Sequence, residues 1–243
     1  HFDNKESETL KKYGSAVELK SWQEPFKYLE EYLRKKNLNN KTFLDYCCGT
    51  GVHSIFPAKL GANVLGIDFS EKSIEIAKKR AKIFQVENQC SFKVQDVKNL
   101  GIINTKFDFI ICVKSLLYLN LDQTFENLSS LLKDNGELLI IESISGNFFF
   151  DLNRMQNTRK INSRFSTFLK KHHSNDILKN AKKYFNVTDL NYFGFSTSIS
   201  YLLEKKLKIS YFRFFFTYLD FFLKKIPFLR KYFFTLAIVL KKN

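Results

Sequence analysis

Short apolar runs recur along the first 145 residues, separated by stretches with helical spacing. Each run is short enough for one buried strand, and a polar or glycine-containing segment bounds it. Four of these runs lie at residues 42–44, 62–67, 92–94 and 107–113. Residues 131–142 read as the end of a helix, an Asn135-Gly136 turn and a fifth strand. The pattern therefore predicts a sheet built from short strands.

Helical patterns lie between these runs, at residues 52–60 and 71–84. Before the first run, Phe26, Leu29 and Leu33 recur at helical spacing and predict an amphipathic helix over residues 21–36. Strands that alternate with helices favour an α/β fold with a parallel sheet covered on both faces.

The second half of the chain has a different pattern of apolar and polar residues. A helix is expected from Asn175-Asp176 to Phe185, followed by a strand over 186–190. Residues 211–226 are rich in phenylalanine and predict a helix that Pro227 ends, and an apolar strand follows over 235–240. The helix is expected to pack through one stripe of apolar residues, namely Phe212, Phe215, Phe216, Leu219, Phe222, Leu223 and Ile226.

Candidate chemistry begins where the first strand ends. Residues 44–51 read Leu-Asp-Tyr-Cys-Cys-Gly-Thr-Gly, so an acid, Asp45, precedes a tight loop with Gly49 and Gly51. Such a strand–loop–helix unit brings a ligand close to bare backbone and to a helix N-terminus. The next strand ends at Asp68, 19 residues after Gly49, which suits an acid that binds ribose hydroxyls. We therefore expect an adenosine-containing cofactor at the carboxyl ends of the strands.

The loop does not fit a dinucleotide or a nucleotide phosphate. Cys47 occupies the first glycine position of the fingerprint, no third glycine follows, and a P-loop lysine is missing. A strand-end acid repels phosphate but suits an ammonium group. S-adenosylmethionine carries a ribose, an adenine and an ammonium, and it has no phosphate.

Taken together, the loop, Asp68, Asp96, the strand from Phe107 and the Asn135-Gly136 turn resemble the class I S-adenosylmethionine-dependent methyltransferases, and within them the small-molecule branch that includes quinone-biosynthesis enzymes. The resemblance spans roughly residues 20–243. It implies a Rossmann-like, doubly wound sheet of seven strands. The last strand would run antiparallel beside strand six at 197–203, with the Phe-rich helix inserted between strands six and seven.

The resemblance also implies one domain over residues 1–243. Residues 1–40 would form N-terminal cap helices, 41–143 the cofactor-binding half, and 144–243 the substrate-side half.

The resemblance implies roles for particular residues. Asp45 would hold the methionine ammonium, Asp68 the ribose hydroxyls, and Asp96 with the Val97 backbone the adenine. The remaining cofactor contacts would come from the loop and strand ends, namely Cys47, Gly49, Gly51, Phe69 and Val113. Simpler roles stay open: Asp45 and Asp96 also suit turns, and Asp68 or Ser70 suits the cap of the helix that follows.

Residues on the acceptor side are less specific. His173 is the candidate general base, although a histidine at a helix start is also an ordinary surface residue. Tyr118, just past the fourth strand, is the candidate to border the methyl acceptor. His53 suits a packing or supporting role, and Trp22 and Tyr28 suit either the substrate side or plain docking of the first helix.

Composition sets the outer limits of function. The 243 residues suffice for one α/β core, and the four cysteines lack metal-ligand spacing, so no metal is expected. Cysteines at strands, together with the absence of a signal-peptide pattern, favour a cytoplasmic protein. The net charge of +15 would suit nucleic acid or anionic lipid, but a Lys-, Asn- and Phe-rich composition explains it equally. Cys112-Val113-Lys114-Ser115 stands where base-methylating enzymes carry a polar-Pro-Pro-aromatic motif, which disfavours nucleic acid.

Two alternatives therefore remain open. The chain is expected to methylate a small or lipid-linked acceptor, or else to bind the cofactor at a membrane as a non-catalytic protein. Phe214, Tyr218 and Phe221 widen the apolar surface of the 211–226 helix beyond one stripe. That surplus suits a peripheral membrane contact, an oligomer contact or ordinary packing.

Overall fold

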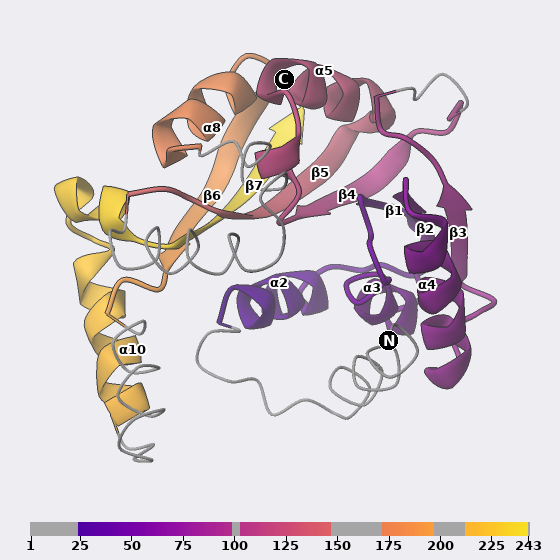
Figure 1. Cartoon of the computed structure of the whole chain (residues 1–243), viewed down its shortest axis with the longest axis horizontal. Helices are drawn as coiled ribbons and strands as arrows, with labels where there is room; N and C mark the ends of the chain where they lie inside the picture. The colour runs from indigo at the N-terminus through magenta and orange to yellow at the C-terminus, as the bar shows by residue number, and fades with distance from the viewer. Residues whose placement is uncertain (1–23, 99–102, 147–171, 197–211, 243) are drawn as a thin grey trace.

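The computed structural model describes residues 24–98, 103–146, 172–196 and 212–242 (Figure 1). Their core is one seven-stranded sheet in the order β3-β2-β1-β4-β5-β7-β6. Strands β1 to β5 run parallel, and β7 pairs antiparallel with both β5 and β6. The strands are β1 (Thr42–Tyr46), β2 (Asn63–Asp68), β3 (Cys90–Val94), β4 (Phe107–Val113), β5 (Leu132–Ser143), β6 (Phe185–Phe193) and β7 (Thr235–Lys242). The predicted doubly wound sheet with an antiparallel last strand is confirmed.

Helices cover both faces of this sheet (Figure 1). One face carries α2 (Glu24–Arg34), α3 (Ile55–Lys59) and α4 (Glu71–Ile83), whereas α5 (Leu121–Leu131) and α8 (Ser174–Ala181) cover the other. Alternate residues of β5 enter the two cores: Leu138 and Ile140 pack with α5 and α8, and Leu139 packs on the α2 side. A strand buried on both faces must be apolar throughout, which explains the continuous runs in the sequence.

The position of strand six that the resemblance implied, residues 197–203, is wrong. The strand that pairs with β7 is Phe185–Phe193, which includes the run expected over 186–190, and residues 197–203 lie outside the described residues. Within the described sheet β6 has β7 as its one partner, so it is an edge strand. An edge strand keeps polar residues such as Asn186 and Thr188, and its signal is therefore weaker than that of a central strand.

The turn expected at Asn135-Gly136 belongs to β5 instead. Phe107 pairs with Leu132 and Phe109 with Glu137, so the intervening residues of β5 form an irregularity inside the strand. A Cβ on Gly136 would lie 2.6 Å from Leu132 Cγ. The glycine is therefore required by close packing within a bulge and not by a free turn.

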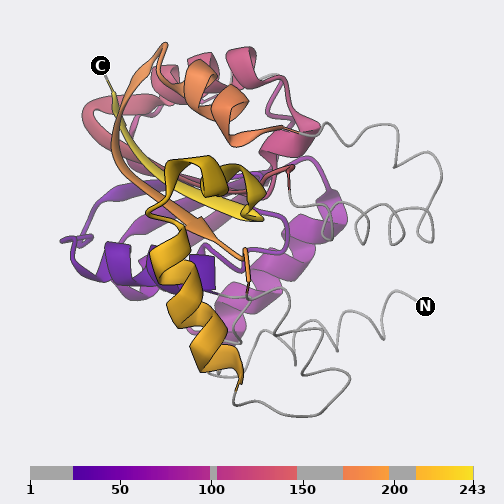
Figure 2. The ribbon, with the colours of Figure 1, turned by 90° about the vertical axis from the view of Figure 1, so that its left-hand side faces the viewer.

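The Phe-rich helix is present between strands six and seven as α10 (Phe212–Leu223), followed by the 3-10 helix η3 (Pro227–Tyr232). The predicted packing stripe is wrong, because Phe215 is 60% exposed and Phe222 and Ile226 are exposed as well. The residue buried toward the body is Asp220, whose carboxylate accepts hydrogen bonds from the Phe195 and Ser196 amides. Polar anchoring lets α10 extend away from the sheet on the α2 side (Figures 1 and 2).

Candidate functional site

Three carboxylates lie where strands of the sheet end. Asp45 is the fourth residue of β1, Asp68 the last of β2, and Glu142 the next to last of β5. The parallel pairings of β1 with β2 and of β4 with both β1 and β5 bring these strand ends to one edge. In open parallel sheets, ligands bind at this carboxyl edge.

Asp68 ties the glycine loop to the start of α4. Its Oδ2 accepts a hydrogen bond from the Gly49 amide at 2.9 Å, and its Oδ1 accepts one from the Ser70 amide at 3.0 Å. Ser70 is the N-cap of α4, since its hydroxyl accepts from the Ser73 amide. Asp68 is therefore not the N-cap of α4. The neighbouring side chain of Phe69 is 78% exposed.

The loop residues adopt left-handed backbone conformations, with φ of +61° at Cys47, +51° at Gly49 and +71° at Gly51. A Cβ on Gly49 would meet nothing within 4 Å, so Gly49 borders open space. A Cβ on Gly51 would lie 2.8 Å from the Ala77 Cβ, so Gly51 lets the loop pack on α4. Cys47 is not a glycine, yet it has the left-handed backbone conformation that glycine adopts most easily.

Asp45 is almost fully buried, with 2% of its surface exposed. Its Oδ2 accepts a hydrogen bond from the Ser54 hydroxyl at 2.6 Å. Burial raises the pKa of Asp45 to about 7, although the Ser54 hydrogen bond opposes the shift. A cationic group beside this carboxyl would favour its ionised form, so the position suits an ammonium.

The adenine side of the expected site is more open. Asp96 is exposed just after β3, and its Oδ1 accepts from the Lys98 amide at 2.9 Å, which is the turn role left open above. Val97 is buried, and its carbonyl accepts from the Tyr46 hydroxyl at 3.5 Å. Val113 ends β4 and is half-buried.

The sequence interpretation missed Glu142, which is fully buried. Its two carboxylate oxygens accept from the Leu116 and Ser143 amides, each at 2.7 Å. Burial raises its pKa to about 7 against these hydrogen bonds. An acid at a strand end was the signal that identified Asp45 and Asp68, and the same signal points to Glu142.

Lys114 was missed too, although it directly follows β4. It holds a φ of +53°, and its amide donates to the Ile141 carbonyl at 2.7 Å. Its ammonium lies 5.0 Å from the centre of the Phe26 ring. That ring packs against the His53 ring with centres 4.7 Å apart and the two planes tilted by 40°. Burial lowers the pKa of His53 to about 4, helped by the positive charges of Lys114 and Arg80, so the imidazole is neutral near pH 7.

Tyr118 and His173 both lie near this edge. Tyr118 ends the short 3-10 helix η2 (Leu116–Tyr118) after β4 and is half exposed. His173 is the exposed N-cap of α8, and its Nδ1 lies 3.3 Å from the carbonyl oxygen of Ser145, three residues past Glu142. Both positions are compatible with contact to an acceptor, and neither side chain is buried.

Tyr28 of helix α2 was expected either to line the substrate side or to help dock the helix. The Tyr28 hydroxyl donates to Asp189 Oδ2 at 2.7 Å, which fixes α2 to β6. Trp22 lies outside the described residues, as does most of the excursion between β5 and α8.

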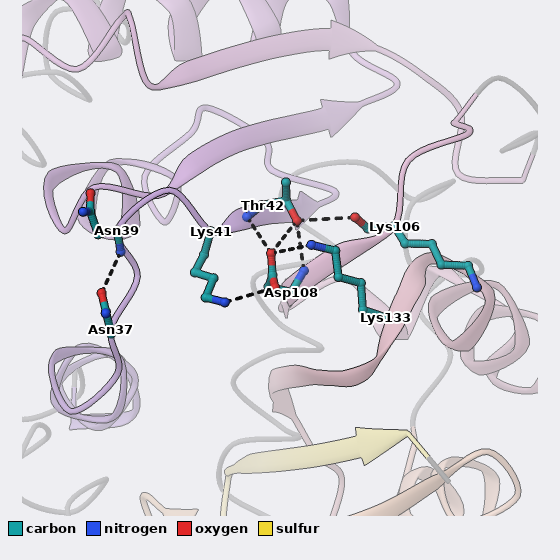
Figure 3. A network of polar contacts seen from close by, with 7 residues as sticks. All are labelled: Asn37, Asn39, Lys41, Thr42, Lys106, Asp108 and Lys133. Atoms are coloured by element: carbon teal, nitrogen blue, oxygen red, sulfur yellow. Dashed lines mark hydrogen bonds and ion pairs between the residues drawn. The ribbon is translucent and has the colours of Figure 1, made fainter.

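The opposite, amino edge of the sheet is organised around Asp108 (Figure 3). Its Oδ2 accepts from the Thr42 amide, the Thr42 hydroxyl and the Lys133 ammonium at 2.8 to 2.9 Å, and Lys41 lies 3.6 Å from Oδ1. Burial favours the neutral acid, but Lys133 and the Thr42 donors hold the pKa of Asp108 well below its usual range. An open hollow of about 450 Å³ borders this edge, between Thr42 and Phe107. Strand-end acids do not line it, so it is a poor candidate for the cofactor.

Known proteins match the chain in both sequence and fold. A family model described as a methyltransferase domain matches residues 37–188. A ubiquinone biosynthesis O-methyltransferase of Coxiella burnetii is 33% identical over 123 residues, which are 50% of this chain and 50% of that protein. The chain thus spans about half the length of the curated relatives it matches.

Two solved structures share the fold. Magnesium protoporphyrin IX methyltransferase from Synechocystis, with bound S-adenosylhomocysteine, has a TM-score of 0.61 and 18% identity over 92% of this chain and 84% of that one. Geranyl diphosphate C-methyltransferase from Streptomyces coelicolor has a TM-score of 0.62 and 13% identity over 89% and 80%. The domain match covers more than half of the chain, which therefore belongs to the class I S-adenosylmethionine-dependent methyltransferases.

Proposed function

We propose that the protein transfers a methyl group from S-adenosylmethionine to a small-molecule acceptor. The observation that carries this proposal is the open space over Gly49, bordered by the carboxylate that ends β2. A bare loop beside a fixed acid suits a ribose whose hydroxyls donate to that acid.

The residues at the carboxyl edge fit the groups of the cofactor one by one. Asp45 would pair with the methionine ammonium, which would restore the charge that burial disfavours. Asp68 would bind the ribose, and the exposed ring of Phe69 would cover the adenine. Asp96 with Val97 would border the adenine edge. Val113, Cys47, Gly49 and Gly51 would supply the backbone against which the cofactor lies, with Gly51 acting through its packing on α4.

When bound, the cofactor supplies an electrophilic methyl group that is already activated. The protein's part is to hold acceptor and donor close and in line and to exclude water. A base is needed only if the acceptor loses a proton in the transfer step. We propose His173 as that base and Tyr118 as a residue that borders the acceptor, because both lie near the carboxyl edge.

The acceptor is proposed to be an oxygen nucleophile on a small or lipid-linked molecule. The supporting observation is the name of the curated relatives, which places them in ubiquinone biosynthesis as O-methyltransferases. The best test incubates the protein with cell extract and S-adenosylmethionine labelled on its methyl group, and then analyses lipid and water-soluble fractions separately. We expect label in one fraction with the wild type and none with Asp68→Ala.

The same screen separates the enzyme from the alternative of a non-catalytic cofactor-binding protein. An enzyme transfers label, whereas a regulator binds S-adenosylhomocysteine without transfer. Binding without label in either fraction would contradict the proposed enzyme. The reaction is proposed to need no metal, and activity that a chelator removes and a divalent ion restores would contradict that statement.

We further propose that the protein meets a membrane surface through the aromatic patch of α10 and η3. The exposed rings of this patch are Phe215, Tyr218, Phe221, Phe222, Phe228 and Tyr232. Lysines lie over them: Lys225 Nζ is 4.7 Å from the centre of the Phe221 ring, and Lys231 Nζ is 4.9 Å from that of Tyr232. Rings edged by cations suit shallow insertion among anionic lipid headgroups. Of the helices that the structure describes, none is long and apolar enough to cross a membrane.

Liposome sedimentation tests this contact. Binding should increase with the anionic lipid fraction and weaken with salt, because exposed charges are screened over a Debye length of about 8 Å at physiological ionic strength. Changing Phe215, Tyr218 and Phe221 together to Ser should reduce binding and leave the melting temperature nearly unchanged. The patch would instead be an oligomer contact if the wild type does not bind anionic liposomes but forms a dimer, and if the triple variant does not form that dimer.

The remaining organisation is proposed on the same basis. We propose that residues 1–243 act as one methyltransferase domain. All four cysteines are free thiols, which fits our proposal of a cytoplasmic protein that associates only peripherally with membranes.

A further inference from the structure

The cluster of Lys114, Phe26 and His53 has no part in the cofactor contacts proposed above. It joins three elements: the end of β4, helix α2, and the segment between the glycine loop and α3. Lys114 follows directly on Val113, so its backbone lies where the proposed methionine contact ends. The cluster therefore borders the place where an acceptor must approach the methyl group.

Lys114 is held in this place at some cost in backbone energy. A non-glycine residue with a φ of +53° is strained by roughly 1–3 kcal/mol, and such strain is concentrated at functional sites. The hydrogen bond from its amide to the Ile141 carbonyl holds this conformation. The side chain is thereby directed to the ring of Phe26, 5.0 Å from its ammonium.

The charge of Lys114 has no close counter-ion among the residues that the structure describes. Across the described parts of the chain, no carboxylate oxygen lies within 4.0 Å of its ammonium. Burial lowers the pKa of Lys114 and the charge of Glu142 opposes this from farther away, but both Glu142 oxygens already accept backbone hydrogen bonds. The Lys114 side chain is nevertheless accessible to solvent. A cation that is accessible, lacks a counter-ion and stands over an aromatic ring is suited to receive an anion.

His53 completes the chemistry of this cluster. Its ring packs against the Phe26 ring at a tilt of 40°, and it stays neutral near pH 7, so it adds a hydrogen-bonding group and no second positive charge. One cation, one neutral imidazole and one aromatic face match a planar acceptor with a single ionised oxygen.

We propose that Lys114 binds the acceptor as an aromatic oxyanion, with Phe26 against its ring and His53 hydrogen-bonded beside it. The acceptor hydroxyl would lose its proton to water on binding, because the ammonium favours the phenolate. An oxygen lone pair then forms the bond to the methyl carbon while the carbon–sulfur bond breaks and its electrons stay on sulfur. The products are a methyl ether and S-adenosylhomocysteine. The oxygen has then no proton to lose in the transfer step, so His173 is not required in it.

This inference rests on the proposed function, and its test uses a chromophoric phenol. Protein saturated with S-adenosylhomocysteine is mixed with 4-nitrophenol, and the absorbance of the phenolate is followed against pH. Bound to wild type, the probe should favour its phenolate form about tenfold more than in free solution. Lys114→Met should abolish this preference, and Lys114→Arg should keep most of it.

Three controls make the outcome decisive. Lys78→Met removes an exposed lysine of α4 and should leave the titration unchanged, which excludes an effect of net charge. S-adenosylhomocysteine affinity should stay at the wild-type level in every Lys114 variant. If Lys114→Met loses its fold, Lys114→Gly removes the charge and relieves the positive φ. A wild type that does not shift the probe, or a Lys114→Met protein that shifts it equally, overturns the proposal. Wild-type protein that fails to bind S-adenosylhomocysteine overturns the proposed function instead.

Discussion

At the amino edge of the sheet, Asp108 receives hydrogen bonds from Thr42 and Lys133. At the carboxyl edge Asp45 and Glu142 are buried, and no cation among the described residues is in contact with either. The pKa of a carboxyl group is therefore shifted in opposite directions at the two edges. The pKa of Asp108 is held low by its donors, and burial raises those of Asp45 and Glu142 to about 7. Ionised Asp108 stabilises the folded chain, whereas ionised Asp45 destabilises it until a cationic ligand arrives. This difference supports our proposal that the carboxyl edge binds the cofactor, and it indicates that the amino edge has a structural role, here called the structural clamp.

The largest expected effect concerns Asp45. Its pKa is raised on folding, so the folded state binds more protons than the unfolded state between pH about 4 and about 7. Stability without cofactor should therefore fall as pH rises through this window, by on the order of 4 kcal/mol from Asp45 alone. Asp45→Asn should flatten the fall, which denaturant unfolding at pH 5 and pH 8 measures. A variant whose stability falls as steeply as that of the wild type would show that Asp45 is not the source.

Substitutions at Gly51 and Gly49 should have different effects, the first mainly on stability and the second mainly on cofactor binding. Gly51→Ala places a Cβ 2.8 Å from that of Ala77 and should lower stability by about 3 kcal/mol, because overpacking adds to backbone strain. Gly49→Ala meets open space and should lower stability by only about 1 kcal/mol from strain, yet weaken S-adenosylhomocysteine binding. Melting curves and calorimetric titration distinguish them. Equal losses of stability would contradict the different surroundings of the two glycines.

A smaller effect is expected at the clamp. Asp108→Ala removes the acceptor of three hydrogen bonds and should cost about 2 kcal/mol at pH 7. The pKa of Asp108 is lowered on folding, so this contribution is present above pH about 4 and is lost as pH falls below that value. Acid unfolding of the variant should therefore show a shallower loss of stability than the wild type below pH 4. A deficit of equal size at pH 7 and pH 2 would indicate a packing defect and not a lost ion pair.

The central sheet could be predicted because its strands are buried on both faces and each ends in a recognisable signal. Asp68 ends an apolar run at a fixed distance from the loop, so its place followed from spacing alone. At the periphery these signals fade. The edge strand β6 keeps polar residues on its open side, and α10 is anchored through Asp220 where apolar spacing predicted a stripe.

Lys114 and Glu142 escaped prediction for another reason. A lysine after a strand has no distinctive spacing in the sequence. Its role depends on which side chains lie near its ammonium in the folded protein. The ring of Phe26 comes from a helix 88 residues earlier in the chain. Glu142 lies at the end of an apolar strand, as Asp45 and Asp68 do, but its burial and its backbone donors follow only from the packing of η2 on β5.

The most direct test of the account is a calorimetric titration of S-adenosylhomocysteine into wild type, Asp68→Ala and Asp108→Ala at pH 7.5. Removing Asp68 would delete the proposed charge-assisted hydrogen bonds to the ribose, each worth roughly 1.5–3 kcal/mol, so affinity should fall at least tenfold. Asp68→Asn, which keeps an oxygen that can accept from the Gly49 amide, should show whether loop order or charge is responsible. Asp108→Ala removes an acid from the opposite edge and should bind as the wild type does. Unchanged affinity in a folded Asp68→Ala protein would contradict the assignment of the carboxyl edge as the cofactor site.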